Sequence, residues 1–210
     1  MACLTQKIRN KLQHILVLAP RGYGKPAAKE LWDTQYQNGK WEFLGSLDEM
    51  ARYMIIHGYI HQVTERLGNK PLALLDVGCG HGQLLRFLHP SCFESYLGID
   101  FSQKAIERAR SSLSANTRFL VADMEKWEGL GQFDLIIFNE VLYYALEPIR
   151  TLVRYQPFLR ENGLFIVSMC KQENHYRILR KLHKDFITLN SVELTTDRQQ
   201  AWKVQLIAPK

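Results

Sequence analysis

The segment Leu74-Leu75-Asp76-Val77-Gly78-Cys79-Gly80-His81-Gly82 decides the fold of this 210-residue chain. It places a short apolar run directly before three closely spaced glycines. Glycine adopts backbone conformations that other residues avoid, and it lets the backbone approach a ligand closely. We therefore expect a buried strand, a tight turn, and the start of a helix whose free N–H groups face a ligand.

The spacing of these glycines narrows the kind of ligand. A dinucleotide site has the pattern G-x-G-x-x-G, whereas this turn has G-x-G-x-G and carries Gln83 where the third glycine would stand. The carboxylate of Asp76 would repel a pyrophosphate and suits a ligand with positive charge. The sequence around Gly24-Lys25 fails as a P-loop, because Ala19 and Pro26 stand where glycine and Ser/Thr are required.

Outward from this segment, short apolar runs alternate with helical stretches. The expected strands are Leu72–Val77, Tyr96–Ile99, Thr117–Val121, Phe133–Phe138 and Leu164–Met169. The expected helices are Ser46–Leu67, Gln83–Leu88, Gln103–Leu113, Leu142–Leu146, Ile149–Leu159 and Asn174–Asp185. Ser46 with Glu49 fits a capping box for the first of these helices, and Gly68 fits its end.

At the C-terminus, Phe186–Leu194 and Ala201–Ile207 flank the polar turn Thr195–Gln200, which predicts a hairpin. Parallel strands covered by helices on both faces define the fold class. We expect an α/β, Rossmann-like, doubly wound sheet of seven strands, mostly parallel, with one antiparallel strand from the C-terminal hairpin.

Residues 1–45 differ in composition from the rest of the chain. The whole chain has 27 Lys and Arg against 21 Asp and Glu, a net charge of +6. Most of that excess lies in the first 30 residues, where the charged side chains are Lys7, Arg9, Lys11, Arg21, Lys25, Lys29 and Glu30. The aromatic residues Trp32, Tyr36, Trp41 and Phe43 follow. The segment is too short to hold a core, so we expect a basic and aromatic arm or lid on a single domain at residues 46–210.

Several classes of protein are excluded by simple patterns. The four cysteines form no CxxC pair, which indicates a reducing compartment, and we expect a cytoplasmic protein. No apolar run approaches the ~18 residues of a membrane span. His57, His61 and Glu65 share a helix face, but Gly58 stands where a zinc-protease motif has glutamate. We expect no metal.

Four further segments extend the evidence, and with the glycine turn they give the chain a family resemblance. They are Tyr96–Asp100, Ala122–Met124, Phe133–Tyr144 and Pro157–Met169. In this order they resemble the class I S-adenosylmethionine-dependent methyltransferases over roughly residues 30–210. Trp32–Tyr36, Trp41, Arg52 and Asn139–Tyr144 are similar to members that methylate small molecules, such as the nodulation-factor N-methyltransferases and enzymes of sugar and natural-product pathways.

The resemblance implies S-adenosyl-L-methionine as cofactor, S-adenosyl-L-homocysteine as product, and a role for several residues. Asp100 would hold the ribose hydroxyls, Asp123 the adenine amino group and Arg52 the methionine carboxylate. Tyr36 and Trp41 would close over the cofactor. The other expected cofactor-binding residues are Asp76, Gly78, Cys79, Gly80, Gly82, Phe101, Met124 and Asn139. Two alternatives stay open: Arg52 could be an exposed helix cation, and the aromatic residues could serve only to attach the arm.

The sequence contains fewer signals for the residues that bind the acceptor. Tyr143 and Tyr144 follow the fourth strand, where the methyl group should emerge, and His175 could reach the same opening. We take Tyr143 as the candidate catalytic residue that orients the acceptor, with Tyr144 and His175 as further acceptor-binding residues. The N-terminal arm, the Tyr143–Pro148 loop and the segment after Cys170 should roof the pocket.

The expected function is transfer of a methyl group from S-adenosylmethionine to oxygen or nitrogen of a small acceptor: a sugar, a natural product or an anionic metabolite. The alternatives are a tRNA or rRNA methyltransferase and a non-catalytic, methyltransferase-like partner subunit. Asn139-Glu140-Val141-Leu142 differs from the Asn/Asp-Pro-Pro-aromatic sequence of enzymes that methylate exocyclic base nitrogens, which argues against nucleic acid. The chain is expected to act as a monomer or homodimer.

Overall fold

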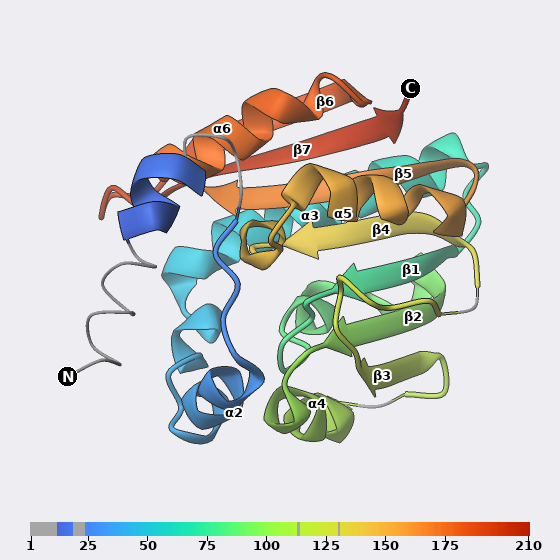
Figure 1. Ribbon diagram of the computed structural model, residues 1–210. Helices are drawn as coiled ribbons and strands as arrows, with labels where there is room; N and C mark the ends of the chain where they lie inside the picture. The colour runs from blue at the N-terminus through green and yellow to red at the C-terminus, as the bar shows by residue number, and fades with distance from the viewer. Residues whose placement is uncertain (1–11, 19–23, 113, 130) are drawn as a thin grey trace.

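Seven strands form one sheet in the computed structural model, which describes residues 12–18, 24–112, 114–129 and 131–210 (Figure 1). The strands are β1 (Leu72–Val77), β2 (Phe93–Asp100), β3 (Thr117–Val121), β4 (Phe133–Asn139), β5 (Leu159–Cys170), β6 (Phe186–Thr195) and β7 (Ala201–Pro209). Their order is β3-β2-β1-β4-β5-β7-β6. The first five are parallel, and β7 is antiparallel to both of its neighbours. The expected fold class is confirmed.

Helices cover both faces of the sheet (Figure 1). The α-helices are α2 (Lys29–Gln37), α3 (Leu47–Arg66), α4 (Gln103–Ala109), α5 (Pro148–Arg154) and α6 (Glu173–Leu182). Short helical turns are η1 (His14–Leu18, π-type) and, of 3₁₀ type, η3 (Glu42–Gly45), η4 (Leu84–Phe87), η5 (Pro90–Cys92), η6 (Arg110–Ser112), η7 (Leu142–Tyr144) and η8 (Gln156–Phe158). Residues of the expected basic arm at Lys7, Arg9, Lys11 and Arg21 lie outside the described residues, as does Leu113.

Strand β1 shows how the core divides into two apolar layers. All of its residues are buried, and their side chains alternate between the faces of the sheet. Leu72 and Leu74 pack in the layer that includes α3 and α4, whereas Leu75 and Val77 pack in the layer beneath α5 and α6. Burial on both faces explains the apolar run Leu72–Leu75, and Asp76 is the one polar residue of this strand.

Three expectations about helices are corrected. The helix expected at Gln83–Leu88 is only the single 3₁₀ turn η4, because about six residues before Pro90 are too few to sustain an α-helix. The helix expected at Ile149–Leu159 is interrupted after Arg154, close to Pro157, and strand β5 begins at Leu159. The side chain of Ser46 forms no capping hydrogen bond, and the Glu49 carboxylate pairs with Arg52, so the expected capping box is absent.

The carboxyl ends of β1, β2, β4 and β5 meet at one edge of the sheet, and the segment after residue 24 crosses this edge. The N–H of Gly24 donates to Leu146 O at 3.1 Å, and that of Lys25 donates to Tyr143 O at 2.9 Å. On the other side, Asp33 of α2 accepts hydrogen bonds from Ser102 Oγ (2.6 Å) and the N–H of Lys104 (3.2 Å) at the start of α4. Across the described ranges, no helix has the length and apolar character needed to cross a membrane.

Candidate active site

A cavity of about 670 Å³ opens at this edge of the sheet. Its wall includes every expected cofactor-binding residue except Gly82: Tyr36, Trp41, Arg52, Asp76, Gly78, Cys79, Gly80, Asp100, Phe101, Asp123, Met124 and Asn139. Of the expected acceptor-binding residues, Tyr143 and Tyr144 also line it, whereas His175 does not. One space therefore collects nearly all residues that the sequence singled out from separate strands.

The glycine turn lets other groups approach the backbone closely. Gly78 and Gly80 both have left-handed backbone conformations, with φ of 71° and 56°. A Cβ on Gly78 would overlap the side chain of Val141, and one on Gly80 would lie 2.6 Å from Tyr36 Oη. The N–H groups of this turn are used within the protein, since those of Gly78 and Cys79 donate to Ile99 O at 2.8 and 3.0 Å. These two N–H groups are therefore not free to bind a ligand.

Asp100, the last residue of β2, carries a half-buried carboxylate that backbone N–H groups hold in place. Its Oδ2 accepts from the N–H of Gly80 (2.9 Å) and its Oδ1 from the N–H of Ser102 (2.8 Å). Burial raises the pKa of Asp100 to about 6, although these hydrogen bonds act in the opposite direction. Each oxygen keeps a second lone pair, so the group can also accept hydrogen bonds from a ligand in the cavity.

Asp123 and Asp76 add two further carboxylates. Asp123 follows β3 and forms a local turn in which Oδ1 accepts from the N–H of Glu125 at 2.9 Å. Asp76 in β1 is buried, and its Oδ2 accepts from the hydroxyl of Tyr96. Its Oδ1 has no hydrogen-bond partner among the described residues. Burial raises the pKa of Asp76 to about 7.

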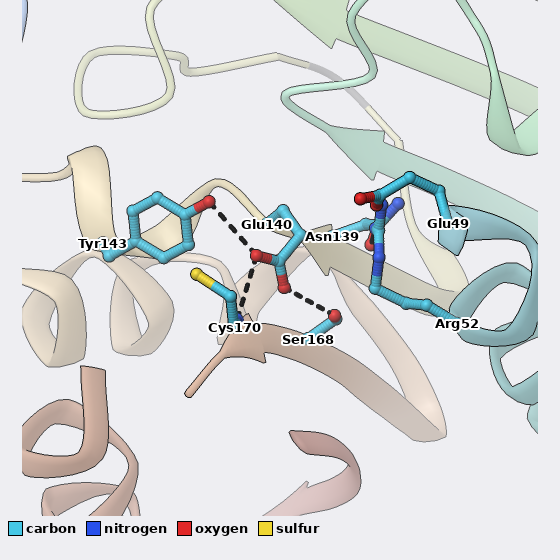
Figure 2. Close-up of polar contacts among 7 residues, drawn as sticks. All are labelled: Glu49, Arg52, Asn139, Glu140, Tyr143, Ser168 and Cys170. Atoms are coloured by element: carbon cyan, nitrogen blue, oxygen red, sulfur yellow. Dashed lines mark hydrogen bonds and ion pairs between the residues drawn. The ribbon is translucent and has the colours of Figure 1, made fainter. Parts of the chain in front are cut away.

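Arg52 on α3 is only 1% exposed, which rules out the alternative of an exposed helix cation. Its Nη2 donates to Oε2 of Glu49 at 2.6 Å, and its Nη1 donates to Oδ1 of Asn139 (Figure 2). Its Nε is buried without a partner in the described part of the chain. The sequence predicted Arg52 at the site but gave Glu49 a different role.

Glu140 is a residue of the site to which the sequence assigned no role. It directly follows β4 and has a left-handed backbone conformation, with φ of 57°, which is uncommon for a residue with a side chain. Its carboxylate accepts from Ser168 Oγ (2.8 Å), the N–H of Cys170 (2.9 Å) and Tyr143 Oη (3.2 Å) (Figure 2). The carboxylate thus ties the loop after β4 to the end of β5 while lining the cavity.

Tyr143 is fixed from two directions. Its hydroxyl donates to Glu140, and its ring stacks on the ring of His175 with 4.0 Å between centroids. Nδ1 of His175 lies 2.9 Å from Cys170 O. Burial raises the pKa of Tyr143 well above its usual value and lowers that of His175. At neutral pH Tyr143 is thus a neutral phenol, and the ring of His175 packs against one face of its ring.

The aromatic residues of the segment before α3 form part of the cavity wall. Trp32 stacks on Trp41 at 5.5 Å and meets the edge of Tyr144 at 4.7 Å. Tyr36 lies 5.9 Å from Trp41. All four line the cavity, and their ring contacts also attach this segment to the core.

The C-terminal hairpin contributes residues that sequence reasoning missed. Gln199 and Gln200 line the cavity from the β6–β7 turn, and Trp202 lines it from the start of β7. Lys171, directly after β5, also lines it and pairs with Glu193 of β6 at 2.7 Å. A polar turn is an ordinary hairpin feature, and nothing in its sequence shows that it folds back over a site.

The unpartnered polar atoms of the wall test whether the expected cofactor fits. Buried donors and acceptors without a partner in the described residues include Arg52 Nε, Asp76 Oδ1, His81 Nδ1 and Trp41 Nε1. Buried polar groups are normally hydrogen-bonded, so such atoms at a cavity wall indicate a ligand with both donors and acceptors. A ligand that joins an amino acid to a nucleoside, such as S-adenosylmethionine, meets this requirement.

The order of the parallel strands reverses between β1 and β4, where ligands bind in open α/β sheets. Fold and cavity therefore define a Rossmann-like protein with a small-molecule site at this switch point. The chain belongs to the methyltransferase domain family, whose sequence profile matches residues 69–205. The family resemblance expected from the sequence is thus confirmed.

Two curated relatives are similar over part of the chain. A malonyl-[acyl-carrier protein] O-methyltransferase of Anoxybacillus flavithermus is 29% identical over 128 residues, covering 60% of this chain and 48% of that protein. Nodulation protein S of Bradyrhizobium diazoefficiens is 32% identical over 111 residues, covering 52% and 50%. The chain therefore spans about half the length of these relatives.

Among solved structures, the N-methyltransferase NodS from Bradyrhizobium japonicum WM9, in complex with S-adenosyl-L-homocysteine, has the same fold. It superposes with a TM-score of 0.69 at 16% identity, covering 87% of this chain and 98% of that one. The likeness extends along nearly the whole length of both chains and concerns the fold.

Proposed function

We propose that this protein is an S-adenosylmethionine-dependent methyltransferase that methylates oxygen or nitrogen of a small acceptor. The observation that carries the proposal is a single cavity whose wall includes Asp100 and Asp123 as well as Tyr143 and Tyr144. A transfer enzyme needs both reactants in one enclosed space and in line. The cofactor, when bound, supplies a methyl group activated by the sulfonium.

Each residue of the cavity wall would bind the part of the cofactor that lies next to it. The Asp100 carboxylate would accept hydrogen bonds from ribose hydroxyls, Asp123 would lie at the adenine end, and Arg52 at the amino-acid end. Tyr36 and Trp41 would cover the cofactor with aromatic surface and exclude water. Residues 1–45 would act as the arm or lid, and residues 46–210 as the catalytic domain.

On the acceptor side we assign orientation to Tyr143 together with Glu140. The neutral phenol of Tyr143 donates to Glu140, so it holds the carboxylate in one position at the cavity wall. A carboxylate so held can accept a hydrogen bond from an acceptor O–H or N–H and orient its lone pair. The cavity is also lined by Pro26, Tyr144 and Gln200, and this lining favours a small acceptor over a nucleic acid. We further propose that the protein acts in the cytoplasm.

Calorimetric titration with S-adenosyl-L-homocysteine tests the cofactor part of this proposal. We expect binding in the micromolar range and a loss of at least about tenfold in Asp100→Ala, because a charged hydrogen-bond acceptor in the cavity wall is removed. No binding at millimolar concentration would refute the proposal. Transfer of radiolabelled methyl to matched sugars, amines and carboxylic acids then identifies the acceptor, and methylation of bulk tRNA alone would favour the RNA alternative.

A further inference from the structure

Acidic side chains dominate the wall of the cavity, although the whole chain is basic. The net charge of the chain is +6, whereas six carboxylates and only two cationic side chains line the cavity. Both cations are already paired, Arg52 with Glu49 at 2.6 Å and Lys171 with Glu193 at 2.7 Å. Four of the lining carboxylates form no ion pair with any residue that the structure describes: Asp76, Asp100, Glu125 and Glu140. A cavity with this charge favours a cationic ligand and disfavours an anion.

A row of aromatic rings borders the acceptor side of the cavity. Trp41 stacks on Trp32, and Trp32 meets the edge of Tyr144 at 4.7 Å. The ring of Tyr144 lies 4.5 Å from that of Tyr143, which stacks on His175. The two tryptophans and the two tyrosines all line the cavity. Aromatic faces attract ammonium groups through their quadrupole, and several rings around one space form an aromatic cage for a cation.

The carboxylate of Glu140 keeps one hydrogen-bonding position open beside these rings. Its Oε2 accepts from the N–H of Cys170 and from the hydroxyl of Tyr143, whereas its Oε1 accepts only from Ser168 Oγ (Figure 2). A carboxylate oxygen has two lone pairs, so Oε1 can accept one further hydrogen bond. Hydrogen bonds between ionised groups are the strongest, and a positively charged N–H donor therefore suits this position best.

We propose that the acceptor is an amine, held between the ring of Tyr144 and the carboxylate of Glu140, and that the methyl group goes to its nitrogen. This inference rests on the proposed function and selects one of the two acceptor atoms that the proposed function allows. It also excludes an anionic acceptor. A carboxylate or phosphate would meet Glu140 without an unpaired cation among the described residues of the wall.

The charges of the transfer fit this assignment. The amine attacks in its neutral form, after its ammonium has released a proton to solvent. Its nitrogen lone pair forms the bond to the methyl carbon, and the carbon–sulfur bond breaks with its electron pair going to sulfur. The nitrogen thereby takes up the positive charge that sulfur loses, close to the rings and to Glu140, and the methylated ammonium releases one proton to solvent. Fixed groups aimed at a developing charge stabilise the transition state.

The competing explanation is that the rings form only an apolar wall and that the carboxylates serve only the cofactor. Choline and 3,3-dimethylbutan-1-ol separate the two explanations, because they have nearly the same shape and only choline is charged. Both are titrated by calorimetry into protein saturated with S-adenosyl-L-homocysteine. We expect choline to bind at least about tenfold more tightly, since ring faces and a carboxylate attract only the cation. Equal affinities, tighter binding of the alcohol, or binding of neither compound would overturn the inference.

Variants of the wall test which residues produce the preference. Glu140→Gln and Tyr144→Leu should each weaken choline binding by about five- to tenfold and change the affinity for the alcohol by less than about twofold. Glu147→Gln is the control, because Glu147 pairs with Arg150 and does not line the cavity. It should leave both affinities unchanged. Equal losses for choline and the alcohol in both wall variants would overturn the inference, and if Glu140→Gln does not fold, Tyr144→Leu still decides.

The outcomes also separate this inference from the proposed function. A wild-type protein that does not bind S-adenosyl-L-homocysteine would refute the proposed function itself. The product of the radiolabelled methyl transfer must be an N-methylated amine. A product with the methyl group on oxygen would overturn the inference alone and leave the proposed function intact.

Discussion

The hydroxyl of Tyr143 donates a hydrogen bond of 3.2 Å to Oε2 of Glu140, a residue with a left-handed backbone conformation. The same carboxylate accepts from Ser168 and from the N–H of Cys170, both in β5. One side chain therefore joins the loop after β4 to the neighbouring strand. The energy of this link is measurable without knowledge of the acceptor.

We expect Tyr143→Phe to lower the free energy of unfolding by about 1 kcal/mol and Glu140→Gln by about 2 kcal/mol, since an amide leaves one buried donor unsatisfied. The double variant should show a coupling of about 1 kcal/mol in urea denaturation. Tyr59→Phe removes a hydroxyl that donates to Asn190 at 3.0 Å and serves as control. The losses of unfolding free energy from Tyr59→Phe and Glu140→Gln should therefore add in the double variant. If the losses from Tyr143→Phe and Glu140→Gln also add, Tyr143 and Glu140 are not coupled and the link is contradicted.

The glycine turn gives a second prediction. Gly78→Ala places a Cβ against Val141 at a left-handed position, with φ of 71°, and should destabilise the protein by about 1–3 kcal/mol. Affinity for S-adenosyl-L-homocysteine should fall together with the stability.

Gly58→Ala is the matched control, because this helical glycine has nothing within 4 Å of an added Cβ. It should stabilise the protein by about 0.5–1 kcal/mol. Thermal unfolding that places both variants on the same side of wild type would contradict this.

The cofactor side of the site could be predicted because its signals are local in the sequence. Spaced glycines after an apolar run mark the turn, and acids such as Asp100 and Asp123 directly follow or end short strands. Parallel strands bring such ends to one edge of the sheet. No long-range contact has to be known for this step, and the cavity contains all of these residues except Gly82.

Other parts of the site depend on contacts that the sequence does not show. Glu140 accepts a hydrogen bond from Ser168, which lies 28 residues away along the chain. The hairpin turn at Gln200 joins β6 and β7 at one end of the strand order, yet it lines the cavity at the carboxyl end of β1. Glu49 has the spacing of a capping box, but the buried guanidinium of Arg52 is a stronger partner than a backbone N–H. A partner three residues away on the same helix thus replaced the capping interaction that the local pattern predicts.

The pKa of Asp100 predicts how nucleoside binding depends on pH. Burial raises this pKa to about 6, and ribose hydroxyls donate more strongly to the ionised form. Affinity for adenosine, which lacks the amino-acid group, should therefore rise by about tenfold between pH 5 and pH 7.5. Asp100→Asn cannot ionise and should bind weakly with a flat profile. A flat profile for the wild-type protein would show that Asp100 does not contact the ribose.

The stability of the protein without ligand should change with pH in the opposite sense. Burial raises the pKa of Asp76 from 3.8 to about 7, so the folded state binds more protons than the unfolded state between about pH 4 and pH 7. The free energy of unfolding should fall as pH rises through this window. Asp100, with its own raised pKa, adds to the fall.

Asp76→Asn cannot lose a proton, so its stability should fall less than that of wild type between pH 5 and pH 8. The difference is bounded by about 1.4 kcal/mol for each unit of pKa shift and is measured by urea denaturation at both pH values. Asp48→Asn, which changes a carboxylate paired with Arg198 near the surface, should follow wild type. Parallel losses in wild type and Asp76→Asn would contradict the raised pKa.

The contact of Asp33 with the start of α4 predicts how fast ligand leaves the cavity. Oδ1 of Asp33 accepts from Ser102 Oγ at 2.6 Å and from the N–H of Lys104 at 3.2 Å, which fixes α2 and its aromatic residues over the opening. Ionic hydrogen bonds of this kind contribute about 1.5–3 kcal/mol. Asp33→Ala should therefore raise the dissociation rate of S-adenosyl-L-homocysteine by about tenfold in stopped-flow tryptophan fluorescence. The association rate should change little, because such losses fall mainly on dissociation.

Glu107→Ala removes an exposed partner of Lys104 on the same helix and should leave both rates unchanged. If Asp33→Ala and Glu107→Ala release the ligand at the wild-type rate alike, then α2 does not control the opening.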